Sequence, residues 1–326
     1  MNSLKSNSLQ RLQSYFDKEK WLKQLYSAYN GCMMSLLSRH PIGTNVYERD
    51  WDVLVILDTC RVDALREVAP EYDFIDTVDS ILSVGSASSE WMAQTFHQKY
   101  LQEVRQTAYV SGNAWSEWVI EDRQMPEEHF NSILSWTKWD VAGADDFLIL
   151  DQAWKYKEED PSNPEPGHLH PRYVTDRAIE IARSHNPGRL VIHYSQPHAP
   201  YTAIALEEQR DLLRHEERPF DHLKDGGSPV RVWNSYLDHL RLGLDHVDTL
   251  INNIDADTVV LSADHGEAFG EWFIYGHPPS VLHPKIRHVP WAVTSAEDSG
   301  EYEPEIDPTQ REGQTATEQL EALGYL

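Results

Sequence analysis

The sequence has few cysteines and no long hydrophobic run. Cys32 and Cys60 are its two cysteines in 326 residues, and their positions form no metal-ligand spacing. Nothing in this pattern calls for a disulfide, which favours a reducing compartment. No stretch approaches the roughly 20 apolar residues that span a bilayer, and no apolar leader with a small-residue cleavage site is present. These absences predict a cytoplasmic protein, at the inner membrane face if it touches a membrane.

Basic residues are also scarce. Lys and Arg number 28 against 53 Asp and Glu, which gives a formal net charge of −25. Proteins that bind nucleic acid neutralise its phosphates with clustered Lys and Arg. The charge balance therefore predicts that nucleic acid is not a partner.

What the chain does contain is the composition of a folded α/β protein. Hydrophobic residues make up 40% of it and there are 11 Trp, enough to bury one large core. Short apolar runs alternate with segments of helical periodicity, which predicts a largely parallel sheet sandwiched by helices. The predicted strands cover residues 52–57, 107–111, 189–194 and 257–262. The predicted helices cover residues 61–68, 172–184 and 230–253.

Charge and composition divide the chain into three regions. Residues 1–45 form a basic amphipathic helical segment, residues 46–295 the main α/β domain, and residues 296–326 an acidic tail with a short helix. In the first region, apolar residues recur at helical spacing through residue 37. Either this helix packs on the main domain, or residues 1–39 contact a membrane surface peripherally.

The most informative motif follows the strand predicted over 257–262. Asp264 and His265 stand side by side at its carboxyl end, and Gly266 lets the backbone turn away. Catalytic groups of open α/β sheets gather at this edge. A lone Asp-His pair is usually a polar turn, but here further potential ligands follow, including Glu267 and His277. The motif therefore predicts a metal site.

Four segments together resemble one known family. The segment from Asp264 to Glu271, followed by Gly276-His277, resembles the carboxy-terminal metal motif of the alkaline phosphatase and sulfatase superfamily. Three further segments resemble parts of the same family in the same order. Trp51–Leu65 resembles its first strand with the metal-binding carboxylate, and His193–Tyr201 resembles its Pro-His-x-Pro-Tyr segment. The tail Leu320–Leu326 resembles the ending of many sulfatase-like chains. This resemblance implies an alkaline-phosphatase-like α/β fold and makes residues 46–295 the catalytic domain.

The resemblance also implies a divalent metal ion. Asp58 ends a buried strand, where a carboxylate has to be hydrogen-bonded, paired or metal-bound. We expect Asp58, Asp264 and His265 to bind the metal. Many family members carry a second adjacent carboxylate where this chain has Thr59, so Mn²⁺ or Zn²⁺ is favoured over Ca²⁺. Whether one ion or two bind is left open.

The nucleophile is expected within the segment Ser83–Met92. This segment lacks the Cys-x-Pro-x-Arg of sulfatases that use formylglycine, and it resembles the nucleophile turn of the phosphoglycerol-transferase branch. Alignment on Glu90 makes Ser86 the predicted nucleophile, activated by the metal. Ser88 and Ser89 remain alternatives.

Other side chains are expected around the ester. By resemblance, His198 contacts the transferred group or protonates the leaving group, and Arg61 stabilises its charge. His277 and Asn113 are weaker candidates for binding the substrate or a second metal. His193, within a strand, is interpreted as a core histidine.

The resemblance predicts a metal-dependent, sulfatase-like hydrolase or transferase that cleaves phosphate or sulfate esters through a metal-activated serine. The expected substrate is an anionic ester, either a small molecule or one linked to a glycan or lipid. Two alternatives stay open: a sulfuric ester hydrolase acting on sulfated glycans, and a non-catalytic binding protein of the same fold.

Overall fold

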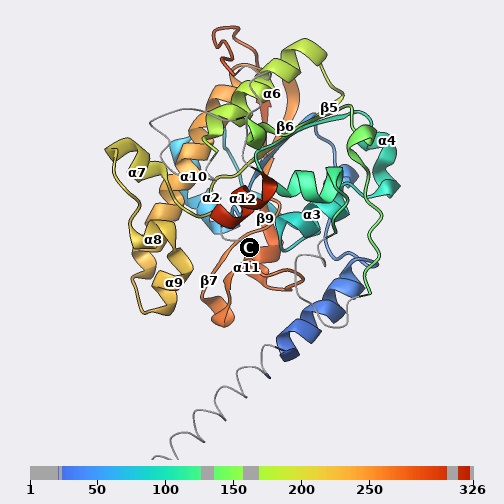
Figure 1. Cartoon of the computed structure of the whole chain (residues 1–326). Coiled ribbons are helices and arrows are strands. Elements are labelled where there is room, and N and C mark those ends of the chain that lie inside the picture. The colour runs from blue at the N-terminus through green and yellow to red at the C-terminus, as the bar shows by residue number, and fades with distance from the viewer. Residues whose placement is uncertain (1–20, 22–23, 126–135, 157–168, 307–314, 324–326) are drawn as a thin grey trace, which may run out of the picture.

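The fold is built on one seven-stranded sheet. The computed structural model describes residues 21, 24–125, 136–156, 169–306 and 315–323. The strands lie in the order β2-β9-β6-β1-β5-β3-β4 (Figure 1). Their bounds are β1 Val53–Leu57, β2 Asp79–Leu82, β3 Thr107–Ser111, β4 Ile149–Asp151, β5 Arg189–Tyr194, β6 Ala256–Ser262 and β9 His288–Ala296.

Strand β1 lies at the centre because both of its faces are apolar. All five of its residues are Val, Leu or Ile and all are buried. It pairs in parallel with β5 on one side and β6 on the other, so that Val55 faces Ile192 and Leu261. β9 runs antiparallel to β6, and β2 runs antiparallel to β9. The predicted, largely parallel sheet is confirmed.

Helices cover both faces of the sheet, as consecutive residues of β5 show. Successive side chains of a strand point to opposite faces. The His193 ring packs against Trp91 of helix α3 (Ser88–Thr95). The hydroxyl of the next residue, Tyr194, hydrogen-bonds Thr175 of α6 (Pro171–His185) at 2.8 Å. α6 also contacts the long helix α10 (Pro229–Ile251), and α10 contacts β1 and α2 (Val62–Val68).

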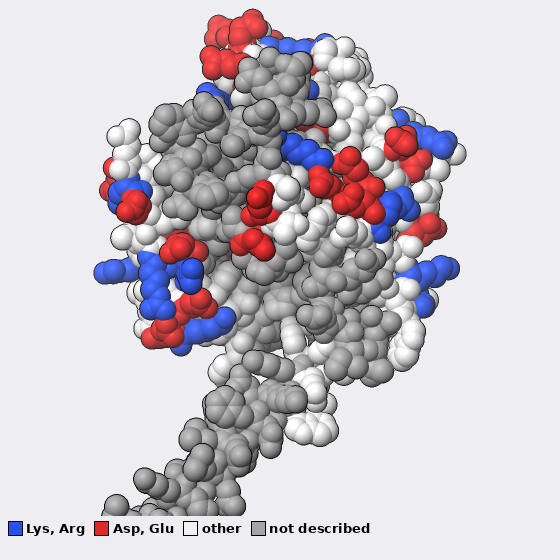
Figure 2. Space-filling model, viewed as in Figure 1, with Lys and Arg blue, Asp and Glu red and all other residues white. Residues whose placement is uncertain are grey.

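Shorter helices complete the fold. They are α4 Leu101–Val104, α7 Ala203–Glu208, α8 Arg214–Glu217, α9 Pro219–Lys224, α11 Pro284–Arg287 and α12 Ala316–Ala322. A two-stranded hairpin joins β7 (Ala268–Phe269) to β8 (Tyr275–Gly276). Lys, Arg, Asp and Glu are interspersed over the described part of the face in Figure 2.

The amino-terminal helix leaves the globule at the lower right of Figure 1, and residues 24–37 of it are described as helical. Its last turns pack on the main domain, because Met34 and Leu37 are buried and Gln94 Nε2 donates to the carbonyl of Leu37 at 2.9 Å. Earlier in the helix, Leu25 and Tyr26 are exposed. Within the described residues no helix combines the length and apolarity needed to cross a bilayer.

The tail is attached to the main domain at two places. The buried Asp176 of α6 accepts hydrogen bonds from the Tyr302 hydroxyl at 2.7 Å and from the backbone N–H of Glu305 at 2.8 Å. Further on, Leu320 of α12 is fully buried, and Gln319 Nε2 lies 3.5 Å from the carbonyl oxygen of Gly112. The three-region division of the chain stays a prediction.

We predict that Asp176→Ala releases the first attachment of the tail. The carboxylate accepts several hydrogen bonds, and losing a charged acceptor of this kind costs about 2 kcal/mol. Urea unfolding is expected to show this loss, and limited proteolysis to show faster cleavage near Tyr302. Glu301→Ala, at an exposed position in the same tail, is the matched control and is expected to change neither. Equal behaviour of the two variants would contradict the assignment.

Candidate active site

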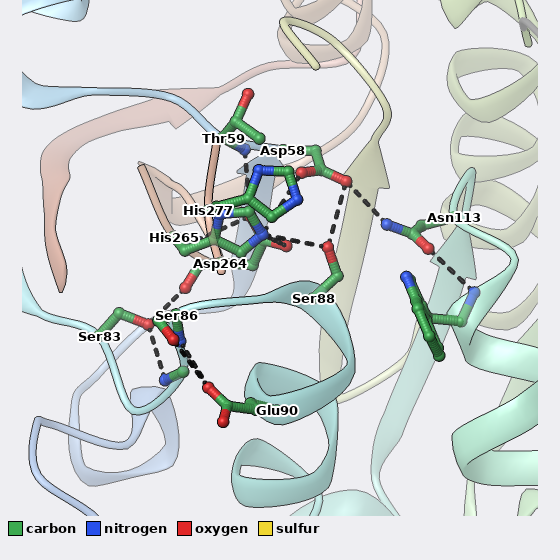
Figure 3. Close-up of polar contacts among 12 residues, drawn as sticks. Asp58, Thr59, Ser83, Ser86, Ser88, Glu90, Asn113, Asp264, His265 and His277 are labelled. Carbon is green, nitrogen blue, oxygen red and sulfur yellow. Dashed lines mark hydrogen bonds and ion pairs between the residues drawn. The ribbon is translucent and has the colours of Figure 1, made fainter. Parts of the chain in front are cut away.

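The site forms where the central strands end (Figure 3). Asp58 follows β1, and Asp264 and His265 follow the neighbouring β6. One ligand atom from each of these three residues lies within 4.8 Å of the others, and all three side chains are buried. The structure thus brings together the three residues predicted to bind metal.

Two backbone features make this convergence possible. The N–H of Thr59 donates to Asp264 Oδ1 at 3.2 Å, and Thr59 adopts a left-handed φ of 67°. Gly266 donates to the carbonyl of Ile286 at 2.7 Å. A Cβ atom on Gly266 would lie 2.2 Å from the Lys285 carbonyl oxygen, closer than any real contact. Glycine is therefore required at this turn because another backbone segment passes directly beside it.

His265 is oriented as a ligand. Its Nδ1 donates to the Gly266 carbonyl at 3.0 Å, which leaves Nε2 to face the carboxylates. Nε2 lies 3.4 Å from Asp264 Oδ2 and 3.8 Å from Asp58 Oδ1. Burial lowers the pKa of His265, which favours the neutral imidazole that binds metals. Burial and the neighbouring charge of Asp264 raise the pKa of Asp58 well above its usual value.

Unsatisfied polar atoms point to a cation at this place. Asp58 Oδ1, Asp264 Oδ2 and His193 Nε2 are buried and have no hydrogen-bond partner within the described structure. Buried polar atoms almost always have partners, and buried charges are paired or coordinate metals. Carboxylate oxygens together with an imidazole nitrogen suit Zn²⁺ or Mn²⁺. The residues present therefore fit a divalent metal ion held by Asp58, Asp264 and His265.

The structure places Ser88 at this cluster. Ser88 is the first residue of α3, and its Oγ lies 3.2 Å from His265 Nε2 and 3.4 Å from Asp58 Oδ2. The helix also begins here, so its amino-terminal N–H groups add positive potential for an anion. Ser89, the next residue, is buried with its Oγ unpartnered in the described structure.

Ser86, predicted as the nucleophile, faces another network. Its Oγ hydrogen-bonds Glu90 Oε2 at 2.9 Å and the Pro278 carbonyl at 3.1 Å, and accepts from the Val281 N–H at 3.1 Å. Figure 3 shows Ser86 beside Glu90, while Ser88 points to the carboxylates. Because helix α3 starts at Ser88, the Ser88 hydroxyl is the one that faces the carboxylates, and Ser86 as nucleophile stays a prediction beside the alternative Ser88. The bonds of Ser86 hold the chain after His277 against α3.

Asn113 holds a metal ligand in position. Lying just beyond β3, it donates from Nδ2 to Asp58 Oδ2 at 2.7 Å, and its Oδ1 accepts from the Trp115 N–H at 2.9 Å. The sequence-based interpretation made Asn113 a donor to the ester. In the structure its amide fixes the rotamer of Asp58.

Two histidines and a glutamate line the opposite side of the cluster. The His277 ring lies 4.3 Å from the His265 ring and 5.1 Å from the His198 ring, centroid to centroid. His277 Nδ1 lies 3.0 Å from Glu267 Oε1. Burial lowers the pKa of His277 to about 4 and that of His198 to about 3, and it raises that of Glu267 to about 7. Both histidines are therefore neutral near pH 7.

The neutral His198 ring is oriented by one hydrogen bond. Its Nδ1 donates to the Ala199 carbonyl at 2.5 Å. The resemblance implies two roles, contact with the transferred group or protonation of the leaving group. The lowered pKa disfavours protonation of the leaving group, since the neutral ring carries no proton on Nε2.

Arg61 is engaged elsewhere. Its guanidinium forms ion pairs with Asp63 at 2.6 Å and Glu271 at 2.8 Å. It also packs on the rings of Trp233 and Phe269. Arg61 thus joins the start of α2 to the β7–β8 hairpin. Its expected role in stabilising the charge of the transferred group stays a prediction.

His193, interpreted as a core residue, belongs to the surroundings of the site. Its Nε2 lies 3.7 Å from Asp264 Oδ2 and 3.8 Å from Asp58 Oδ2, while Nδ1 lies 2.9 Å from the Tyr109 hydroxyl. The sequence carries a signal for this, because β5 is parallel to β1 and His193 is its next-to-last residue. Cys60 is buried, and burial raises the pKa of its thiol far above the usual range.

Comparison with known proteins returns only structural likenesses. No family model matches the chain, and no curated protein matches it by sequence. Among solved structures, the soluble domain of lipooligosaccharide phosphoethanolamine transferase A from Neisseria meningitidis is 13% identical, with a TM-score of 0.49 and 76% of each chain covered. The periplasmic domain of a phosphoethanolamine transferase from Campylobacter jejuni is 13% identical, with a TM-score of 0.42, covering 74% of this chain and 78% of that one.

Other similar structures come from the superfamily that the motifs resemble. A protein in the alkaline phosphatase superfamily from Vibrio parahaemolyticus is 11% identical, with a TM-score of 0.39, covering 85% of this chain and 71% of that one. A 2-O glycosaminoglycan sulfatase is also found. At these identities they show a likeness of fold to members of the superfamily that the motifs resemble. At these identities and scores, the activity has to be inferred from the site itself.

The expected cytoplasmic location is wrong by the same comparison. The similar structures from Campylobacter jejuni and Escherichia coli are periplasmic domains. The structure from Neisseria meningitidis is the soluble domain of a transferase, and a second structure of that transferase is described as an integral membrane protein. The cytoplasmic expectation rests on the scarcity of cysteine and of long apolar runs. Neither feature distinguishes the cytoplasm from other compartments.

We predict that Asp264→Asn loses metal while the fold is kept. The variant keeps the shape of the side chain but removes the charge that pairs with a cation, so divalent-metal affinity is expected to fall by at least about 100-fold. Zinc titration and elemental analysis measure this loss. Asp63→Asn, which changes a carboxylate outside the cluster, is the matched control. Full metal occupancy in Asp264→Asn would contradict the metal assignment.

Proposed function

We propose that this chain is a metal-dependent enzyme that cleaves anionic phosphate or sulfate esters, with Ser88 as nucleophile. The observation that carries the proposal is the position of the Ser88 hydroxyl, 3.2 Å from His265 Nε2 and 3.4 Å from Asp58 Oδ2. A serine hydroxyl at the first residue of a helix, beside a cluster suited to a divalent cation, has the setting that activated nucleophiles need.

The reaction follows from the residues around Ser88. A metal ion bound by Asp58, Asp264 and His265 supplies Lewis acidity, which lowers the pKa of a nearby hydroxyl. Ser88 Oγ attacks the phosphorus or sulfur atom, its proton passes to the leaving oxygen, and the bond to that oxygen breaks, which leaves a serine ester and a free hydroxyl compound. The N–H groups at the start of α3 bind the equatorial oxygens. Water or an acceptor hydroxyl then attacks the serine ester, the bond to Ser88 Oγ breaks, and the proton of the attacking group returns to Ser88 Oγ.

The groups beside His265 give the site a pH dependence. His198 and His277 are neutral, and Glu267, with a pKa raised to about 7 by burial, changes charge near neutral pH. We infer that activity falls as the pH drops below about 7. Protonation of Glu267 removes the negative charge that accepts from His277 Nδ1.

A sulfuric ester hydrolase is the second candidate function, since nothing in the cluster distinguishes phosphorus from sulfur. Turnover of matched aryl phosphate, aryl phosphodiester and aryl sulfate substrates by the purified protein decides between these activities. A protein that binds metal but turns over none of them supports instead the non-catalytic alternative.

We predict that Ser88→Ala abolishes turnover, by about 1,000-fold or more, because the attacking oxygen is removed. Metal affinity is expected to fall much less, since all three proposed ligands remain. Ser86→Ala is the matched control: it is expected to lower the free energy of unfolding by about 1–3 kcal/mol, through Glu90, and to retain turnover. A trapped, labelled ester that maps to Ser86 would show that the nucleophile is misassigned.

A further inference from the structure

The exposed hydrophobic side chains of this protein are concentrated on one side. Of fourteen large hydrophobic residues exposed in the described structure, ten lie on the amino-terminal helix, in the segments that contact it, or on the chain from Gly270 to Leu282. The β7–β8 hairpin and the helix both project at the lower side of Figure 1. Scattered exposed hydrophobic residues are normal, but a gathered set marks an interaction surface.

The hairpin tip carries the most exposed of these residues. Phe273 is 94% exposed and Trp272 is 67% exposed. Both adopt left-handed φ angles, 59° and 53°, which are costly for bulky residues. Phe273, which is almost fully exposed, gains very little from packing in the protein to offset this cost. The tip is therefore built to present Trp272 and Phe273 outward.

The helix presents a second apolar group. Four exposed side chains recur at a spacing of about one helical turn, which places them on one face: Trp21, Leu25, Tyr26 and Tyr29. The helix is not an independent appendage, because its final turns are packed, with Met34 fully buried. These side chains are thus held at a defined place relative to the main domain.

Contacts connect the helix to the hairpin. The Trp272 ring lies 4.6 Å from the His283 ring, next to the exposed Leu282. Arg287, one turn further on, donates to the carbonyl of Ile42, which follows the amino-terminal helix and is itself exposed. The two apolar groups therefore border a single side of the molecule, which we call the apolar side.

Charge identifies the partner. Within residues 1–39 there are six Lys and Arg against two Asp and Glu, in a chain whose net charge is −25. An acidic protein is repelled by an anionic surface unless its basic part faces that surface. Trp and Tyr prefer the interface between lipid headgroups and acyl chains, and basic residues beside them add attraction to anionic lipids.

We propose that the apolar side docks on the surface of an anionic lipid bilayer, with the hairpin tip and the amino-terminal helix inserted at the headgroup level. The hairpin begins just after Glu267 and ends just before His277, so docking sets the active site beside the headgroups. The substrate class that this placement fits is an anionic ester carried on a lipid. This substrate assignment rests on the proposed function, whereas the docking itself does not.

Vesicle flotation of the full chain tests the docking. We expect the protein to float with vesicles of phosphatidylglycerol and phosphatidylcholine, and less with phosphatidylcholine alone. The double variant Trp272→Ser/Phe273→Ser is expected to bind about tenfold more weakly. Val230→Ser, which changes an equally exposed residue at the start of α10, is the matched control and is expected to bind as wild type does. Phe273→Ser alone replaces the double variant if that variant does not fold.

Two results would overturn the proposal. One is equal flotation of the wild type and the hairpin variant. The other is absence of wild-type binding to anionic vesicles, whether the chain is then monomeric or self-associated by sedimentation equilibrium. Turnover of a soluble aryl ester by the wild type separates the two proposals. Vesicle binding without turnover supports the docking and contradicts the proposed enzymatic function. Turnover without vesicle binding supports the enzymatic function and contradicts the docking.

Discussion

The site depends on the burial of two carboxylates side by side. Asp58 and Asp264 come from adjacent strands of a sheet whose centre is covered on both faces, so water does not screen their charges. Burial and the charge of Asp264 raise the pKa of Asp58, so the pair carries both charges near pH 7 only when a cation compensates them. Asn113 donates a hydrogen bond to Asp58, and the Thr59 N–H donates one to Asp264. The hydrogen bond of His265 Nδ1 to the Gly266 carbonyl turns its Nε2 toward both carboxylates. Asp58 Oδ1 and Asp264 Oδ2 are left without a hydrogen-bond partner in the described structure.

The parts of this arrangement that follow from topology could be predicted from the sequence. Apolar runs ended by Asp58 and by Asp264 identify two parallel strands, and the carboxyl ends of parallel strands meet at one edge. That geometry brings the three ligands together without any knowledge of side-chain packing. The same rule places His193 at this edge, but a histidine inside a strand also fits a core position, so the pattern alone did not decide.

The parts that depend on local rotation or on competing partners could not be predicted. Ser86 and Ser88 are two residues apart, and which hydroxyl meets the carboxylates depends on where helix α3 begins. Arg61 lies close in sequence to Asp58, yet Asp63 and Glu271 bind its guanidinium. No spacing rule reveals Glu271 as a partner of Arg61, because the two residues lie far apart in the sequence and only the fold brings them together.

The position of Arg61 bears on how the active site and the apolar side are joined. Arg61 begins the turn into α2 directly behind the carboxylate of Asp58, and its ion pair with Glu271 and its packing on Phe269 hold the β7–β8 hairpin. The same hairpin carries Trp272 and Phe273 at its tip and His277 at its end. Because one buried guanidinium ties the strand-end loop to this hairpin, a displacement of the tip is resisted at the site, and the predicted metal ligands and the outward-facing aromatic residues are held at a defined relative position.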